Sequence, residues 1–145
     1  MAHSLRPISD ADYLWLWSLK RETMRTYVEQ TWGKWDDDWQ AERFRQNFRP
    51  DHVQVIVLDG QDAGLLHVVR SPEEIRLVNI QISPEFQNRG LGTTVMHGLL
   101  AEARTAGLPL RLQVLKVNPA RRLYERIGFA VAAETETHYQ MRWTP

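Results

Sequence analysis

With 145 residues, 43% of them apolar and 25% charged, the chain has the size and composition of one globular domain, which we expect to span residues 1–145. Its formal net charge of zero argues against nucleic acid or an anionic membrane as a partner, and its lack of cysteine excludes disulfides, cysteine-ligated metals and a cysteine nucleophile. The first residues lack the apolar segment of a signal peptide, and no apolar run approaches the roughly 20 residues that span a bilayer, so we expect a cytoplasmic protein.

The first half of the chain predicts a short strand, two helices and a three-stranded meander. Residues 5–8 can form an edge strand, and Ser9 or Asp10 can cap a helix whose apolar residues recur up to Val28. A second helix is expected over residues 36–48. The apolar period then changes to alternation, which predicts strands at residues 53–57, 63–70 and 75–82, with turns at 59–62 and 71–74.

The second half predicts a strand–helix–strand–helix order followed by a hairpin. Pro84 ends the preceding strand, and a glycine-containing turn leads into a helix that Gly107 and Pro109 end. Every fourth residue of this helix is apolar, which forms one stripe: Leu91, Val95, Leu99 and Ala103. A strand at 110–115, a helix opened by Asn118-Pro119 and closed by Gly128, and strands at 129–133 and 137–143 follow. We therefore expect an α/β fold with a mixed, mostly antiparallel central sheet and helices on both faces.

The most informative segment is the turn before the third helix, which reads Gln87-Asn88-Arg89-Gly90-Leu91-Gly92-Thr93. A helix N-terminus leaves backbone N–H groups unpaired and carries a partial positive charge, and glycines let a phosphate approach the bare backbone. The segment is not a P-loop, because no lysine follows Gly92, and it is not a dinucleotide fingerprint, because Val95 stands at the third glycine position. It therefore predicts a pyrophosphate site of another kind, and a purely structural turn is the alternative.

The turn belongs to an ordered series of motifs. Ile80-x-Ile82-x-Pro84 precedes it, and Asn118 and then Leu123-Tyr124-Glu125-Arg126-Ile127-Gly128-Phe129 follow at the end of the next strand. In this order and spacing the motifs resemble the GCN5-related N-acetyltransferase (GNAT) family over about residues 77–129. The resemblance implies that acetyl-coenzyme A is the cosubstrate, that no metal takes part, and that an amine of a small molecule or peptide attacks the thioester directly in a ternary complex. Exposed strands and many aromatic residues are compatible with a homodimer.

The resemblance also implies roles for individual residues. Tyr124 matches the family tyrosine that protonates the leaving thiolate, and packing in the core is its alternative role. Asn118 matches the asparagine that contacts the pantetheine arm, although it stands six residues before the tyrosine where the family usually has seven; a helix cap is its alternative role. The strand that pairs with the pantetheine arm matches Ile80, Gln81 and Ile82, and the N–H near Ile80 or Gln81 would stabilise the oxyanion. The loop that holds the coenzyme A pyrophosphate matches Gln87, Asn88, Arg89, Gly90, Leu91, Gly92 and Thr93.

The group that takes the proton of the amine is left open. Some members of the family place a glutamate on the strand before the loop, but Arg76 stands at the matching position and cannot act as a base. A water chain is one alternative, and side chains that could serve are Glu73, Glu74, Asn79, Gln81 and His138. The missing carboxylate also leaves open a second function, a non-catalytic acetyl-coenzyme A sensor that regulates a partner protein.

The segment at residues 29–39 is where acceptor-binding helices lie in the family. Tryptophans here stand beside three consecutive aspartates, Asp36 to Asp38. Together they could attract and enclose a cationic amine. The alternative is a helix start capped by aspartate with the tryptophans packed behind it.

Overall fold

The computed structural model describes residues 2–145, and within them it contains seven strands and four α-helices. The strands follow the order β1-β2-β3-β4-β5-β7-β6, in which β4 and β5 are parallel and the pairs β1–β2, β2–β3, β5–β7 and β6–β7 are antiparallel. The expected α/β class with a mixed, mostly antiparallel sheet is thus confirmed. Among the described residues, no helix has both the length and the apolar character needed to cross a bilayer.

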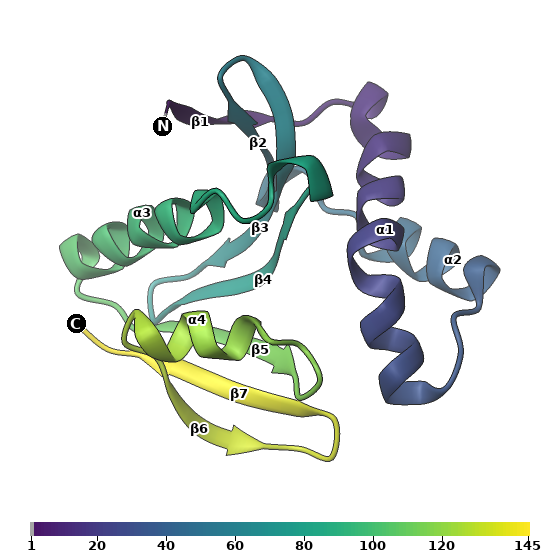
Figure 1. Ribbon diagram of the computed structural model, residues 1–145. Helices are drawn as coiled ribbons and strands as arrows, with labels where there is room; N and C mark the ends of the chain where they lie inside the picture. Colours follow the sequence, from purple (N-terminus) through teal and green to yellow (C-terminus); the bar gives the residue numbers. More distant parts are fainter. Residues whose placement is uncertain (1) are drawn as a thin grey trace. The chain divides into compact units, whose positions relative to one another are not determined.

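The chain divides into two compact units (Figure 1). The first unit comprises the described residues up to His67 together with Asn79–Leu91. The second unit comprises Val68–Val78 together with Gly92–Pro145. The strands β3 (Gln61–Arg70) and β4 (Ile75–Ile82) each contribute residues to both units.

The first unit contains β1, α1, α2 and β2 in addition to its parts of β3 and β4. Gly33, with φ +89°, ends α1 in the left-handed conformation that glycine adopts at low cost. The side chain of Asp36 accepts a hydrogen bond from the Trp39 N–H at 3.1 Å and so caps α2. Asp59 and Gly60 both have positive φ, which suits the tight turn between β2 and β3. The bounds are β1 (His3–Pro7), α1 (Tyr13–Trp32), α2 (Asp37–Asn47) and β2 (Val53–Leu58).

The core of the first unit lies between α1 and the strands β2 and β3. Leu16 and Leu19 of α1 are almost completely buried against Val53 and Val55 of β2 and Leu65 of β3. Phe44 of α2 and Phe48, which directly follows this helix, pack against the cluster, and Phe44 also contacts Tyr13 and Trp17 of α1. Burial of such side chains supplies the main driving force for folding, so α1 and α2 are fixed on these strands by their apolar residues.

The backbones of β3 and β4 approach each other closely at Gly64. A Cβ atom at this position would lie 2.3 Å from the carbonyl oxygen of Gln81 and 3.2 Å from Cδ1 of Ile82. No ordinary Cβ contact is that short, so only glycine fits without moving the strands apart. Next to this contact, the N–H of Ser83 donates to the carbonyl of Ala63 at 2.8 Å. The end of β4 is therefore held tightly against β3.

The second unit places both of its helices on one face of its strands. Arg104 of α3 lies over the ring of Trp143, and Arg121 of α4 lies over the ring of Tyr139, both on β7. The predicted apolar stripe of α3 is buried, as are Leu110, Leu112 and Met141 on the strands. Because side chains alternate along a strand, Gln140 and Arg142 lie on the face that these helices do not cover. The elements are α3 (Leu91–Ala106), β5 (Leu110–Leu115), α4 (Ala120–Arg126), β6 (Ala130–Glu134) and β7 (His138–Trp143).

Candidate active site

The loop between β4 and α3 is exposed and contains two residues with left-handed backbone. Asn88 has φ +63° and Gly90 has φ +78°, and residues 87–90 are all exposed. Left-handed residues in a turn can direct successive N–H groups into one anion-binding concavity. The side chain of Gln87 donates a hydrogen bond to the carbonyl of Ile82 at 2.8 Å, which ties the loop to the end of β4. The structure therefore brings Ile82 and the predicted phosphate loop together.

Gly92 leaves open space at the start of α3. A Cβ atom built at Gly92 would meet no atom within 4 Å, and its backbone is not in the left-handed region. The fold itself does not require glycine there. A ligand that approaches the backbone of the first helical turn does require it, because a side chain would fill the space that the ligand needs. The loop and the first turn of this 16-residue helix thus fit a pyrophosphate.

Gln81 is a buried polar residue near the end of β4, in the segment predicted to bind the pantetheine arm. Its side chain is 4% exposed, and its Oε1 atom has no hydrogen-bond partner among residues 2–145. A buried carbonyl oxygen without a donor costs on the order of 1–3 kcal/mol. A water or an N–H group of a bound molecule would remove this cost.

Tyr124 and Asn118 belong to the second unit. Tyr124 lies on α4, packs edge-on against Phe129 and is 7% exposed. Burial raises the pKa of its phenol to about 12, so the hydroxyl is protonated and able to donate at neutral pH. The side-chain oxygen of Asn118 accepts a hydrogen bond from the N–H of Ala120 at 2.9 Å, at the first residue of α4. Asn118 thus has the capping role that the sequence offered as its alternative.

We expect Tyr124 to make the fold less stable as the pH rises from about 10 to about 12. Below pH 10 its phenol is protonated in both states, whereas above it the unfolded chain loses the proton first and the folded chain keeps it up to about pH 12. At pH 11 the loss amounts to about 1.4 kcal/mol. Urea unfolding near pH 9 and near pH 11 measures it. Between pH 9 and pH 11, the variant Tyr124→Phe should lose about 1.4 kcal/mol less unfolding free energy than the wild type. An equal loss in both proteins would contradict the burial of the phenol.

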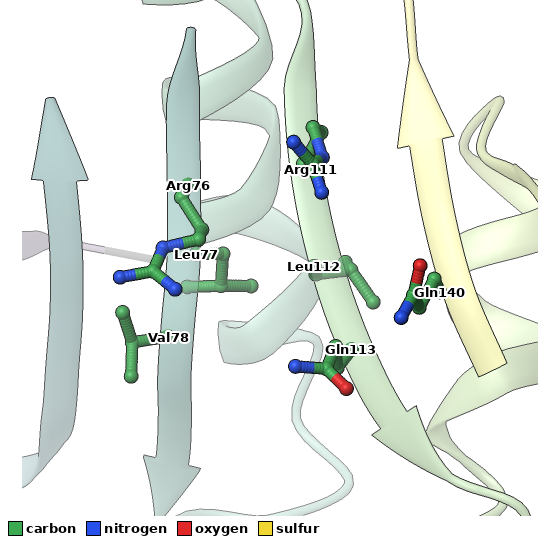
Figure 2. Close-up of a pocket in the computed structure, with 7 residues that line it drawn as sticks. All are labelled: Arg76, Leu77, Val78, Arg111, Leu112, Gln113 and Gln140. Atoms are coloured by element: carbon green, nitrogen blue, oxygen red, sulfur yellow. The ribbon is translucent and has the colours of Figure 1, made fainter. Parts of the chain in front are cut away.

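Polar side chains that the sequence did not connect meet on the face of the second unit opposite its helices. Figure 2 shows Arg76, Arg111, Gln113 and Gln140 on the near side of the strands, while Leu77 and Leu112 lie behind them. In the parallel pairing of β4 with β5, Ile75 lies opposite Leu110, Arg76 opposite Arg111 and Leu77 opposite Leu112. The next residues on the two strands, Val78 and Gln113, line a cavity of about 130 Å³. The cavity thus lies over two of these pairs and extends past the point where the pairing ends.

The candidates for the proton acceptor differ in their surroundings. Glu74 binds Arg111 through Oε1 at 3.1 Å, which commits it to an ion pair. His138 lies at the start of β7, and its Nδ1 is 2.7 Å from Oγ1 of Thr137. Burial lowers the pKa of His138 below its usual value of 6.5, so the imidazole is neutral at pH 7. The tautomer of the imidazole decides whether Nδ1 donates or accepts in this contact.

The tryptophans and aspartates of residues 29–39 are engaged largely with groups of the chain itself. Trp17 stacks on Trp35 at 6.1 Å between ring centroids, and the guanidinium of Arg21 lies over the ring of Trp17. Asp37 accepts hydrogen bonds from the indole of Trp35 and from Arg21. Asp36 caps α2, as the alternative role expected, but Trp32 and Trp39 are 56% and 55% exposed, so the tryptophans of this segment are only partly packed.

Within residues 2–145, no three histidine, aspartate or glutamate side chains form a group that could hold a metal ion. The features that remain are the exposed loop before α3, the buried Tyr124 and the polar cavity beside β5.

Comparison with known proteins identifies one family. The chain matches the family described as "Acetyltransferase (GNAT) domain" over residues 23–145. A curated relative, the "[Ribosomal protein bS18]-alanine N-acetyltransferase" of Salmonella typhimurium, is 39% identical over 69 residues, which are 46% of this chain and 47% of that protein. The match thus spans about half the length of that relative.

Solved structures share the fold over the whole chain. The PaiA N-acetyltransferase from Thermoplasma acidophilum in complex with coenzyme A is 16% identical with a TM-score of 0.77, and the alignment covers 100% of both chains. The ribosomal-protein-S18-alanine N-acetyltransferase from Escherichia coli is 20% identical with a TM-score of 0.71, and the alignment covers 99% of this chain and 94% of that one. At these identities the likeness shows a common fold.

Proposed function

The chain belongs to the acetyltransferase (GNAT) family, and we propose that its residues 1–145 form one catalytic domain that transfers the acetyl group of acetyl-coenzyme A to the N-terminal amine of a peptide or protein. The observation that carries the proposal is the exposed loop at residues 87–90, which leads into a long helix whose second residue, Gly92, leaves open space. The relative named above, which acts on the alanine of a ribosomal protein, supports a protein N-terminus as the acceptor.

The residues that hold the coenzyme are proposed to lie in one continuous stretch of chain. The N–H groups of residues 87–93 and the positive end of α3 would bind the pyrophosphate. The edge of β4 at Ile80–Ile82 would bind the pantetheine arm, and the unpartnered Oε1 of Gln81 would accept a hydrogen bond from an amide of that arm. We propose no contact for Asn118 beyond its capping bond, although its side-chain N–H₂ group can still donate.

Acetyl-coenzyme A supplies a thioester, at whose carbonyl carbon the amine forms a C–N bond while the C–S bond breaks. We propose that Tyr124 gives its phenolic proton to the departing sulfur, because its phenol is protonated at neutral pH and could donate to a sulfur held in contact with it. Backbone N–H groups near Ile80 and Gln81 would stabilise the negative charge that develops on the carbonyl oxygen. No covalent enzyme intermediate is needed, and the chain has no cysteine to form one.

An α-amine is a better acceptor than a lysine side chain for this site. Arg76 stands where a carboxylate base could have been, so the enzyme depends on the fraction of amine that is already neutral. With a pKa of about 8, roughly a tenth of an α-amine is neutral at pH 7, whereas a lysine with a pKa near 10.4 is only about 0.04% neutral. His138, neutral at pH 7, is a candidate to take the remaining proton.

Exchange of Gly92 for alanine tests the phosphate site. We expect Gly92→Ala to be at least as stable as the wild type, because the new methyl group meets no atom within 4 Å and alanine favours a helix by about 0.5–1 kcal/mol. We also expect it to bind acetyl-coenzyme A at least about tenfold more weakly, a loss of about 1.4 kcal/mol. Calorimetric titration with acetyl-coenzyme A measures the affinity.

The matched control is Gly98→Ala, in the same helix. A Cβ at Gly98 also meets nothing within 4 Å, so this variant should gain stability and keep the wild-type affinity. Equal affinity of all three proteins would mean that the loop is only a structural turn, and a wild type that does not bind acetyl-coenzyme A would refute the proposed function.

A further inference from the structure

Three arginines stand side by side across three neighbouring strands of the second unit. The register pairs Arg76 of β4 with Arg111 of β5, and Arg111 with Arg142 of β7. Residues in direct register point to the same face, here the face opposite α3 and α4, and all three arginines are exposed. We call Arg76, Arg111 and Arg142 the arginine row.

Only one of the three arginines in the row is paired with a negatively charged side chain among the described residues. Glu74 forms an ion pair with Arg111, and its other oxygen, Oε2, is buried without a hydrogen-bond partner among the described residues. Within residues 2–145, Arg76 and Arg142 form no salt bridge. Like charges in direct register destabilise a sheet, so the row weakens the fold and needs another reason to be there.

A polar cavity adjoins the arginine row. Arg76 and Arg111 line it together with Gln113 and Gln140, which are paired directly opposite each other on β5 and β7 (Figure 2). Guanidinium groups bind carboxylates with two parallel hydrogen bonds, and glutamine amides can both donate to and accept from a peptide backbone. The combination of a cationic row and an amide pair beside an open cavity fits an extended peptide that carries carboxylates.

We propose that the arginine row binds acidic side chains of the acceptor, so that the preferred substrate is a peptide whose first residues after the reactive amine are aspartate or glutamate. This inference rests on the proposed function and specifies its acceptor. Arg76 lies four residues before Ile80 on the same strand, and both residues fall on the same alternating face of β4. A peptide with its amine near the thioester could therefore run along β4 and reach the row at Arg76.

Three peptides test the proposal. Two of them have a free N-terminal alanine, and their residues 2–4 are either Glu-Asp-Glu or the uncharged Gln-Asn-Gln. The third peptide has a blocked N-terminus and one lysine. Fluorescence anisotropy gives the affinity of the labelled peptides, and initial rates at saturating acetyl-coenzyme A give kcat and KM. We expect the acidic peptide to have a KM at least about tenfold lower than the uncharged one at low salt, and the difference to shrink in about 0.5 M NaCl.

The double variant Arg76→Gln/Arg142→Gln should bind and acetylate the two peptides alike. Its affinity for acetyl-coenzyme A should stay near the wild-type value, and circular dichroism confirms that it folds. The control Arg126→Gln removes an exposed arginine of α4, outside the row, and should keep the preference.

A wild type that acetylates both peptides equally would overturn the acidic preference but leave the proposed function standing. An acidic peptide that binds through the row but is never acetylated would refute the function and leave the row as a binding site. Weaker binding of acetyl-coenzyme A by the double variant would show that the row binds the coenzyme and not the acceptor, which would overturn the proposal.

Discussion

Replacing Tyr124 with phenylalanine is expected to lower kcat by about 100-fold or more, because general acid catalysis contributes roughly 10²–10⁴-fold to such reactions. The hydroxyl is the only group removed, and the ring keeps its edge-on contact with Phe129 in the buried face of α4. The affinity for acetyl-coenzyme A should therefore change little. Initial rates with a peptide that has a free N-terminal amine and calorimetric titration with acetyl-coenzyme A measure the two quantities on the same preparation.

A second tyrosine provides the control for this variant. Tyr139 lies on β7, where the cationic groups of Lys116 and Arg121 are over its ring, and it has no proposed part in the reaction. Tyr139→Phe should keep both kcat and affinity. If Tyr124→Phe also kept its kcat, the phenol would have only a packing role and the leaving thiolate would take its proton from water.

Gly64→Ala is expected to destabilise the protein by roughly 2–3 kcal/mol, at the upper end of the usual cost of overpacking. The added Cβ would lie 2.3 Å from the carbonyl oxygen of Gln81, and both atoms belong to the backbones of paired strands, which cannot rotate away. The strands must therefore separate near Gln81 and Ile82. Since these residues are proposed to bind the pantetheine arm, the affinity for acetyl-coenzyme A should fall together with the stability.

Urea denaturation and coenzyme titration test both effects. Gly98→Ala serves again as the comparison, because the same substitution there meets no atom within 4 Å and should raise the stability. A Gly64→Ala variant as stable as the wild type would show that β3 and β4 are less close than the structure has them. A variant that keeps the wild-type stability but binds acetyl-coenzyme A more weakly would show that the added methyl group hinders the coenzyme directly and does not separate the strands.

Elements bounded by strong turn signals could be read from the sequence. The bounds of β4 and β5 agree with the expected strands at residues 75–82 and 110–115, because turn residues stand at both ends of each. The helix α1 extends to Trp32, beyond the last apolar residue that was used to predict it. Gly33 determines where it ends, whereas the prediction relied on the last recurring apolar residue. The short 3-10 turn at Asp10–Asp12 was missed, since three residues carry too little periodicity to detect.

The candidate site was also predicted from the sequence only in part. The loop before α3 was predicted because the adjacent residues themselves carry the signal, and the helix N-terminus explains it physically. Arg76, Arg111 and Arg142 were not connected, because they become neighbours only through the register of three strands that lie far apart in the chain. The same limit applies to Gly64, whose contact with Gln81 follows from strand spacing and not from any local pattern.

The arginine row has a consequence for attempts to evolve the protein in the laboratory. Because the row keeps like charges in register, a selection for heat resistance alone should enrich replacements of Arg76 or Arg142 among the first gains. Such variants would survive heating better while their choice among acceptors broadens. A library screened for acetylation of an acidic peptide after heating would instead have to find its stability elsewhere, for example at exposed helical glycines such as Gly98.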